Sequence, residues 1–263
     1  MLFDVGPYPD LWLDNARRLG IDLSRIECIF LSHWHFDHSG GFPEVITTVS
    51  AARAASGFAR PRVDLHPNRP DQRGILLPGG LMIMLPPEPA FDVLAKAGGE
   101  IATTAEPHSI CAGFFFGSGA IDRVTDYETG LAGHHTFRGE VGEPDPLIMD
   151  ERLVAACVRG RGVTVFSACS HAGIVNACLS AKKHFPGFPV DAVLGGYHLA
   201  GKAMESRIEP TVRDLKERIE PRLVAPGHCT GWRAKASLAN TFAPGRYAPS
   251  VVGTLYRLGA VAG

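Results

Sequence analysis

Residues 26–41 read IECIFLSHWHFDHSGG, a short apolar stretch followed by a segment rich in metal-ligand types. The apolar residues predict a buried strand over 26–31, and an extended chain sends His33 and His35 to the same side. A turn that starts at Asp37 directs Asp37 and His38 toward an adjacent point. The segment therefore predicts two neighbouring metal positions at the exit of one strand.

The residue types in this segment indicate which metals bind. Imidazole is the commonest protein ligand of a borderline metal and a carboxylate serves a second ion, so we expect two divalent ions. Zn²⁺ fits best, with Fe or Mn as alternatives. The competing interpretation is a polar loop that happens to contain several histidines, but three His and one Asp crowd directly behind a buried strand.

Later apolar stretches repeat this arrangement, because each predicted strand leads into a segment with further ligand types. These candidates are Cys169 and His171 after residues 163–166, His198 after 190–194, and His228 after 222–225. Ligands at the same edge of a sheet can converge on one site although they lie far apart in sequence. For each histidine the alternative is a hydrogen-bonded structural side chain.

The composition is that of an ordinary globular protein. Of 263 residues, 45 % are hydrophobic and 20 % are charged, and 26 Lys and Arg against 27 Asp and Glu leave a formal charge of −1. This balance supplies no positive field for nucleic acid or an anionic membrane. We therefore expect a small-molecule substrate, with no nucleic-acid or membrane partner.

Cysteine usage and the first residues bear on the cellular location. Six cysteines are spread along the chain without a C-x-x-C pair, which favours reduced thiols. The first 20 residues lack a basic region ahead of an apolar stretch, so they do not resemble a secretory signal. These features predict a cytoplasmic protein. No change in composition marks a boundary, so we expect a single domain over residues 1–263.

Glycine (30 residues) and proline (20 residues) separate many short elements. Further strands are predicted at 75–77, 81–85, 114–116 and 251–258. Helical periodicity predicts helices at 10–19, 172–184 and 211–219. Residues 130–150 show no period and predict a long irregular loop. The order of these elements indicates mixed sheets with helices outside.

Residues 32–41, SHWHFDHSGG, resemble the H-x-H-x-D-H motif of the metallo-β-lactamase fold superfamily. FSACSHAGIVN (166–176), LGGYHL (194–199) and PGHCTGW (226–232) resemble its branch of 7,8-dihydropterin-6-yl-methyl-4-(β-D-ribofuranosyl)aminobenzene-5′-phosphate synthase-like proteins. The resemblance runs from Leu2 to about Gly259. It implies an α+β fold, an αββα sandwich with a metal site at one edge. It also implies the metal ligands His33, His35, Asp37, His38 and His228.

The sequence departs from the superfamily pattern at the site. Members usually carry a metal-bridging Asp after the strand that we place at 163–166, where this chain has Cys169 and His171. We expect one of these two to take that place, and we favour His171 because its longer side chain gives it reach. The His that usually precedes this strand has no clear match. His108 is the first candidate, and His134 and His135 are weaker ones.

The beginning of the chain departs as well. Proteins of this fold usually have further strands before the segment LFDVG, which here follows Met1 directly, so we expect the first strands to be missing. An uncovered sheet edge exposes unpaired backbone and favours association. We therefore expect a homo-oligomer as an alternative to a monomer.

Together these features predict a metal-dependent hydrolase whose dinuclear site activates water on an ester or phosphodiester-type substrate. In this hypothesis Asp37 orients the water and His198 donates a proton to the leaving group. Arg123 and Glu128 are candidates for contacts to a charged substrate, with a surface ion pair as the alternative. The branch name implies a second function, a pterin-linked transferase that releases pyrophosphate. A third is an inactive protein that only binds a metal or ligand.

Overall fold

The computed structural model describes residues 1–259, which form two compact units. Unit 1 comprises Met1–Ala105 and Leu131–Asp150, and unit 2 comprises Glu106–Gly130 and the described residues from Glu151 onward. Each unit has its own sheets and its own buried core. The expected single domain over residues 1–263 stays a prediction, because two compact halves occur within single domains as well as in chains of two domains.

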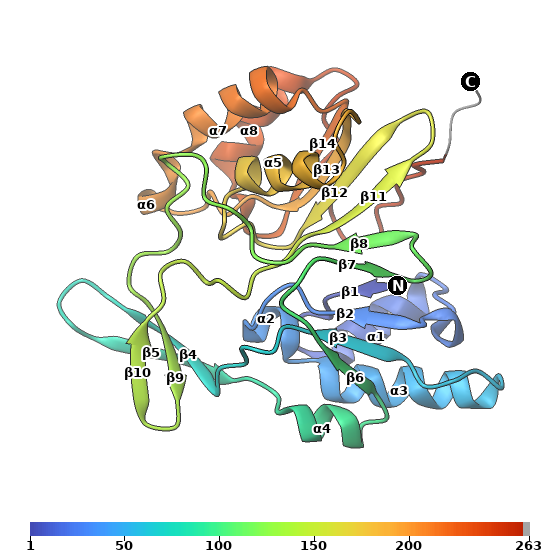
Figure 1. Ribbon diagram of the computed structural model, residues 1–263. Helices are drawn as coiled ribbons and strands as arrows, with labels where there is room; N and C mark the ends of the chain where they lie inside the picture. The colour runs from blue at the N-terminus through green and yellow to red at the C-terminus, as the bar shows by residue number, and fades with distance from the viewer. Residues whose placement is uncertain (260–263) are drawn as a thin grey trace. The chain divides into compact units, whose positions relative to one another are not determined.

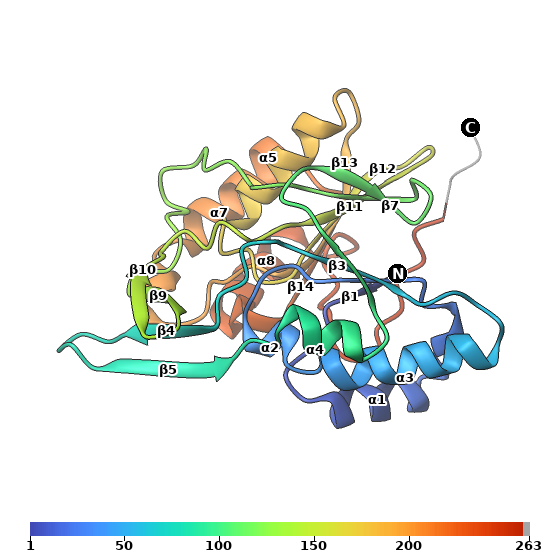
Figure 2. The ribbon, with the colours of Figure 1, turned by 60° about the horizontal axis from the view of Figure 1, so that its bottom comes forward.

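Unit 1 contains a parallel four-stranded sheet in the order β1-β2-β3-β6. Its strands are β1 (Leu2–Phe3), β2 (Cys28–Phe30), β3 (Arg62–Leu65) and β6 (Glu100–Thr103). The helices of this unit include α1 (Pro9–Arg18), α3 (Phe42–Ala55) and α4 (Phe91–Lys96), and the short 3-10 helix η1 spans Leu23–Arg25. Helices α1 and α3 lie side by side (Figure 2). Strand β2 confirms the strand expected at 26–31, and α1 confirms the helix expected at 10–19.

Helix α3, which the sequence analysis did not predict, anchors the ligand segment. Phe42, Val45, Ile46 and Val49 are fully buried, and their spacing places them on one face of the helix. Trp34, between two of the expected ligands, is fully buried in the same apolar cluster. Packing therefore holds the segment that leaves β2 against the core of unit 1.

The second sheet of unit 1 is antiparallel, in the order β10-β9-β4-β5. Its strands are β4 (Gln72–Leu76), β5 (Met82–Pro87), β9 (His134–Arg138) and β10 (Val141–Pro144). Figure 2 shows β4 and β5 as a long hairpin, which confirms the strands expected at 75–77 and 81–85. The irregular loop expected at 130–150 is wrong, because this stretch contains β9 and β10. Strand β9 pairs with β4, which is remote in sequence, and β10 pairs with β9, so pairing stabilises two strands that carry little apolar periodicity.

Unit 2 is built on a six-stranded mixed sheet in the order β14-β13-β12-β11-β8-β7 (Figure 1). Its strands are β7 (His108–Ile110), β8 (Phe115–Gly117), β11 (Val154–Val158), β12 (Gly162–Ser167), β13 (Val190–Gly196) and β14 (Leu223–Gly227). Strands β12, β13 and β14 run parallel, and their register pairs Ser167 with Gly195 and Gly195 with Pro226. The carboxyl ends of these three strands therefore lie level, as expected from the sequence.

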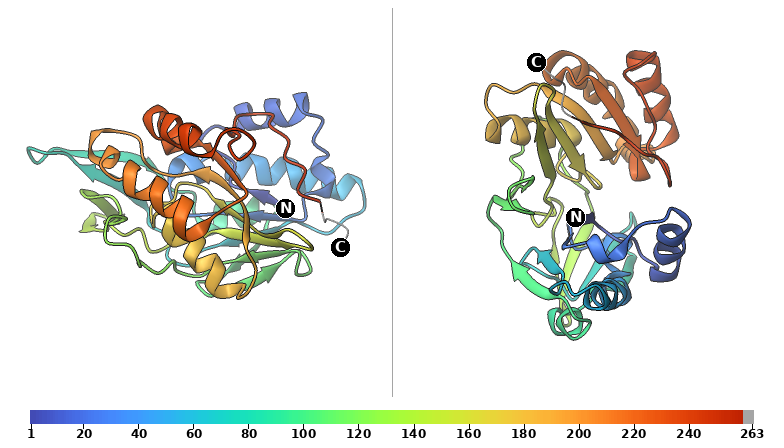
Figure 3. Two further views of the ribbon diagram at one scale, coloured as in Figure 1. Left: turned by 90° about the horizontal axis from the view of Figure 1, so that it is seen from above. Right: turned by 90° about the vertical axis from the view of Figure 1, so that its right-hand side faces the viewer.

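The helices of unit 2 are α5 (Ile174–His184), α6 (Lys202–Glu205), α7 (Ile208–Asp214) and α8 (Trp232–Phe242). Helices α7 and α8, orange and red in Figure 3, lie side by side. The sheet and the helices share one buried core. Its fully buried members include Val165 of β12, Val175 of α5, Leu238 of α8 and Leu215. The helix expected at 172–184 is confirmed by α5.

Two expectations for unit 2 need correction. The helix expected at 211–219 is interrupted, because α7 ends at Asp214 and residues Leu215–Ile219 form a π-helical turn, η2. The strand expected at 251–258 is wrong, because residues 251–259 form no strand. Tyr256 and Leu258 instead pack against Ala192 and Leu194 of β13. Over residues 1–259 no helix combines the length and apolar character needed to cross a membrane.

Candidate metal centre

The ligand segment runs from the end of β2 into the short helix α2 (Phe36–Ser39). His33, His35 and His38 are buried, whereas the Asp37 side chain is half exposed. The ring centroid of His33 lies 4.6 Å from that of His35 and 4.4 Å from that of His38. The structure thus brings the three histidines of the motif into one buried group.

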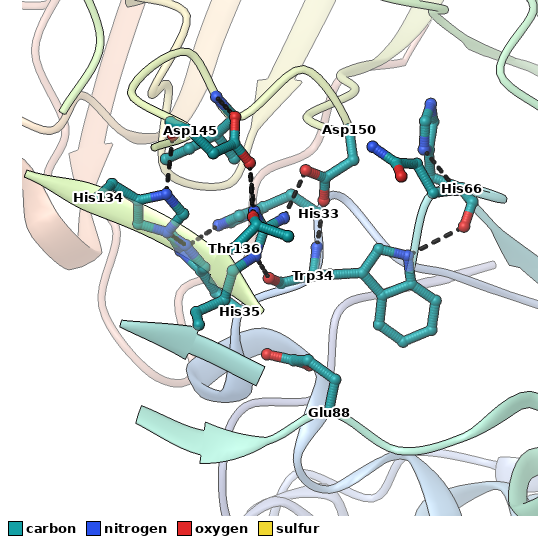
Figure 4. A network of polar contacts seen from close by, with 12 residues as sticks. His33, Trp34, His35, His66, Glu88, His134, Thr136, Asp145 and Asp150 are labelled. Carbon is teal, nitrogen blue, oxygen red and sulfur yellow. Dashed lines mark hydrogen bonds and ion pairs between the residues drawn. The ribbon is translucent and has the colours of Figure 1, made fainter. Parts of the chain in front are cut away.

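A fourth histidine, His134 of β9, joins this group. Its Nε2 lies 2.8 Å from Nε2 of His35, and Nδ1 of His35 lies 3.0 Å from Nε2 of His33 (Figure 4). Among the candidates for the His missing from the superfamily pattern, His134 is therefore the one placed beside the motif. His135 points to the opposite face of β9, and His108 lies on β7 of unit 2.

Hydrogen bonds assign the tautomers of two of these rings. Ser32 Oγ donates its one proton to Asp4 Oδ2 at 2.7 Å, so at 2.8 Å from Nδ1 of His33 it accepts a proton from the ring. Nδ1 of His134 donates to the backbone oxygen of Asp145 at 2.8 Å. Nε2 therefore carries a lone pair in both rings.

These lone pairs meet at His35. In the neutral form in which it binds a metal, His35 carries one N–H and can donate to His33 or to His134 but not to both. In the other contact two nitrogen atoms, 2.8 or 3.0 Å apart, face each other with lone pairs. A cation bound between them stabilises this arrangement. Burial lowers the pKa of His134 to about 4, with the charge of Arg73 acting in the same direction, so this ring is neutral as a metal ligand must be. The three imidazoles fit a divalent cation.

His38 is oriented by Asp4, a residue that the sequence analysis did not select. Nδ1 of His38 donates to Asp4 Oδ2 at 2.8 Å, and Nε2 lies 3.4 Å from Asp37 Oδ2. Burial lowers the pKa of His38, but the charge of Asp4 and the hydrogen bonds to Asp37 and Asp4 outweigh it and raise the pKa to about 10. Asp4 thus turns Nε2 toward Asp37, and a metal ion that binds this nitrogen must displace its proton.

A buried ion-pair network holds the peptide between the first two motif histidines (Figure 4). Trp34 N donates to Asp150 Oδ2 at 2.7 Å, and Arg73 Nε donates to the backbone oxygen of Trp34 at 2.9 Å. Arg73 also pairs with Asp150 Oδ1 at 2.5 Å and with Asp145 Oδ2 at 2.6 Å. Because the backbone oxygen of Asp145 accepts from Nδ1 of His134, the network connects the backbone of Trp34 with the ring of His134. We call Arg73, Asp145 and Asp150 the clamp.

Glu88 is a second buried carboxyl beside the motif. Ser39 Oγ, at the end of α2, donates to Glu88 Oε2. Burial raises the pKa of Glu88 to about 7, against the opposing effects of the Ser39 hydrogen bond and the charge of Arg73. Figure 4 shows Glu88 on the same side of unit 1 as His35 and Trp34.

In unit 2 the expected candidates lie at the exits of β12, β13 and β14. Sγ of Cys169 lies 3.2 Å from Nε2 of His228, which begins the 3-10 helix η3 (His228–Thr230). The rings of His171 and His198 are 4.3 Å apart. One ligand atom each from Cys169, His198 and Cys229 lie within 4.8 Å of one another. The structure therefore brings these candidates together and adds Cys229, which the sequence analysis did not select.

The environment of Cys229 favours its thiolate. A hydrogen bond with the side chain of Cys169 lowers the pKa of Cys229, and the imidazoles of His198 and His228 act in the same direction against the effect of burial. The thiolate is the form of cysteine that binds metals.

Glu151 positions the backbone of the segment after β12. Its carboxylate accepts from the backbone N–H of His171 at 2.8 Å and of Ala172 at 2.7 Å. Glu151 is buried, and burial raises its pKa. This contact fixes the position of the backbone from which the His171 side chain extends.

The two expected substrate contacts differ in their surroundings. Glu128 is buried and accepts from the backbone N–H of Val175 and Asn176, both at 2.9 Å, so it caps the first turn of α5. A Cβ on Gly173 would lie 2.0 Å from Cδ of Glu128, so this cap requires a glycine there. Arg123 is half-buried, and burial lowers its pKa against the charges of Glu151 and Glu128. The geometry thus gives Glu128 a helix-capping role.

Comparison with known proteins identifies the class. Residues 1–198 match the sequence profile of the metallo-beta-lactamase superfamily, so the chain belongs to this superfamily. It has the metallo-β-lactamase fold, with mixed helices and sheets. The superfamily generally binds metal ions, in agreement with the grouped histidines and cysteines within each unit.

Individual relatives refine this comparison. The 7,8-dihydropterin-6-methyl-4-(beta-D-ribofuranosyl)-aminobenzene-5'-phosphate synthase of Methanocaldococcus jannaschii is 28 % identical over 247 residues, which cover 92 % of this chain and 79 % of that protein. An uncharacterized protein of the same organism is 27 % identical over 247 residues, 93 % of this chain and 85 % of that protein. The solved structure of Tm1679, described as a metal-dependent hydrolase of the beta-lactamase superfamily, matches with a TM-score of 0.77 and 25 % identity. That match covers 98 % of this chain and 88 % of that one.

Proposed function

We propose that the chain is a metal-dependent hydrolase that cleaves an ester or phosphodiester bond of a small molecule. The arrangement of His33, His35 and His134 carries this proposal, because two assigned lone pairs face the ring of His35 at 2.8 and 3.0 Å. The description of Tm1679 as a metal-dependent hydrolase supports it.

Each unit supplies its own group of proposed ligands for a divalent ion. Zn²⁺ fits them best, with Fe or Mn as alternatives. They are His33, His35, Asp37, His38 and His134 in unit 1, and Cys169, His171 and His228 in unit 2. When bound, such ions acidify water and stabilise negative charge that develops on the electrophile.

The chain's own groups then orient the reactants. Asp37 is half exposed, so its carboxylate can reach solvent and orient the attacking water. Asp4 holds Nδ1 of His38 at 2.8 Å and thereby fixes the direction of its ring. Arg123 is kept as a contact for an anionic substrate, whereas Glu128 caps α5. Proton donation by His198 stays a prediction from the sequence.

Metal content and turnover test this proposal. The purified chain is analysed for bound elements and then assayed against p-nitrophenyl phosphodiester, thioester and lactone substrates. His134→Ala should lose bound metal and hydrolysis together. His135→Ala is the matched control, because it removes the next imidazole of the same strand, and it should retain both. Equal metal content and equal turnover in the two variants would refute the proposed role of His134.

A second candidate function follows from the name of the relative from Methanocaldococcus jannaschii. In this alternative, which the branch resemblance implies, the chain joins a pterin pyrophosphate to a ribofuranosyl aminobenzene phosphate and releases pyrophosphate. Pyrophosphate release that requires both substrates, without hydrolysis of the ester panel, would favour the synthase over the hydrolase. Bound metal with neither activity would favour a protein that only binds metal.

A further inference from the structure

Two thiols and one imidazole meet at the carboxyl ends of β12, β13 and β14. One ligand atom each from Cys169, His198 and Cys229 lie within 4.8 Å of one another, and all three residues belong to unit 2. Ligand atoms that share one tetrahedral zinc ion, with bonds of about 2.0 to 2.3 Å, are separated by about 3.3 to 3.8 Å. Small side-chain rotations therefore bring the three atoms to bonding distance of one ion.

The backbone leaves room for this approach at Gly196. A Cβ at that position would lie 2.7 Å from Sγ of Cys229, 2.5 Å from the backbone oxygen of Ala168 and 3.2 Å from Cδ2 of His228. Any other residue would clash with the backbone oxygen of Ala168 and with the thiol, so their close arrangement would have to change. The glycine at the end of β13 is therefore a condition for placing Cys229 beside Cys169.

The backbone also takes an unfavourable conformation at the two strand exits. His198 has φ of 46° and His228 has φ of 40°, values that non-glycine residues rarely adopt. Such conformations persist where the surrounding structure imposes them, and they cluster at functional sites. Here they accompany the turns that present His198 and Cys229.

The ring of His198 retains an unused polar atom. Its Nδ1 is buried and has no hydrogen-bond partner within residues 1–259. A buried polar atom without a partner is rare in native proteins and calls for an explanation. A bound cation supplies one, either at this nitrogen or by rotation of the ring.

We propose that Cys169, Cys229 and His198 bind one soft divalent cation of the Zn²⁺ class. Both cysteines bind as thiolates, any thiol proton that is still present passes to solvent, and the two negative charges balance the charge of the ion. Thiolate ligands favour soft and borderline ions over Mg²⁺ or Ca²⁺. This site shares Cys169 with the proposed function and adds Cys229. For His198 it is the alternative to the role of proton donor, and the Co²⁺ affinity of the His198→Gln variant distinguishes the two.

Cobalt titration tests the site directly. The full chain is freed of metal with a chelator under reducing conditions and titrated with Co²⁺ without oxygen. Thiolate bound to Co²⁺ absorbs in the near ultraviolet, and the intensity grows with the number of thiolates. We expect this band in the wild-type chain, about half its intensity in Cys229→Ser or in Cys169→Ser, and none in the double variant, since the site has two sulfur ligands. Cys157→Ser, at an exposed cysteine of the same unit, should leave the band unchanged.

An unchanged band in Cys229→Ser, or no band in the wild-type chain, would overturn the proposal. His198→Gln keeps both thiols, so it should retain the band but weaken Co²⁺ binding. Unaltered Co²⁺ affinity in that variant would remove His198 from the site.

A second measurement needs no variant. Alkylation of the wild-type chain by iodoacetamide, followed by mass spectrometry, should be slowed by Zn²⁺ at Cys169 and Cys229 but not at Cys157. Equal alkylation rates with and without Zn²⁺ would contradict the site even if the serine variants fail to fold. Neither measurement depends on turnover. A chain that binds Co²⁺ through both thiols but hydrolyses nothing would refute the proposed function and leave this site standing.

Discussion

Replacing Asp150 by Asn tests whether the clamp holds the motif. Arg73 and Asp150 are each only 1 % exposed and form an ion pair of 2.5 Å. Asp150 Oδ2 also accepts from the backbone N–H of Trp34. In Asp150→Asn the buried guanidinium keeps Asp145 but loses its most buried counter-charge. The new amide N–H₂ must also face a donor, either on Arg73 or on Trp34.

The magnitude follows from these two effects. Breaking a buried ion pair by removing one partner costs about 3–5 kcal/mol, and Asp145 as a remaining partner favours the lower end, about 3 kcal/mol. The peptide that shifts lies between His33 and His35, so we also expect metal affinity to fall by about 10- to 100-fold, as when an outer-shell partner of a metal ligand is removed.

Two assays measure these effects on the full chain. Denaturant unfolding of the metal-free protein gives the free energy of unfolding, and competition with a chelator gives the metal affinity. Asp92→Asn is the control, because Asp92 is an exposed carboxylate of unit 1 paired with Lys96, and both quantities should stay unchanged. A loss below about 1 kcal/mol in Asp150→Asn, the size expected of a surface ion pair, together with unaltered metal affinity, would refute the role of the clamp.

Further predictions concern the other buried groups. Glu88 has a pKa of about 7 in the folded chain against an ordinary 4.5. Between these pH values the folded state binds more protons than the unfolded state, so the free energy of unfolding of the metal-free chain should fall by roughly 3 kcal/mol as pH rises from 4.5 to 7. Denaturant unfolding across this range should show the decline in the wild-type chain and a flatter profile in Glu88→Gln; identical profiles would mean that Glu88 is not the titrating group. Glu128→Gln should lower the free energy of unfolding by about 1 kcal/mol through loss of the charged cap of α5, without changing the KM of an anionic substrate. A raised KM with unchanged stability would restore its expected substrate contact. Gly196→Ala should weaken Co²⁺ binding and reduce the thiolate band, because the added Cβ displaces Cys229; a wild-type titration would show that the close approach is unnecessary.

The sequence predicted the elements whose stability depends on local pattern. The apolar runs that became β12, β13 and β14 are continuous and buried, and the helix α5 follows from its own periodicity. Strands β9 and β10 were missed because few of their residues are apolar. Strand β9 is stabilised by pairing with β4 about sixty residues away, and β10 by pairing with β9. The expected strand at 251–258 failed for the opposite reason, since Tyr256 and Leu258 cover a sheet face without joining the ladder, and Val251, Val252 and Leu255 are exposed.

The residues of the candidate site likewise divide into those that the sequence predicted and those that it did not. H-x-H-x-D-H places its ligands within six residues, so alternation along a strand and the turn after it were enough to select His33, His35, Asp37 and His38. His134 could have been ranked higher only by recognising β9, and Arg73 and Asp150 carry no local signal at all. Sequence by itself therefore determined the superfamily and selected the core of the proposed ligand set. Only the tertiary structure decided which remote residues complete it, because hydrogen bonds and ion pairs depend on distances in space that strand pairing sets.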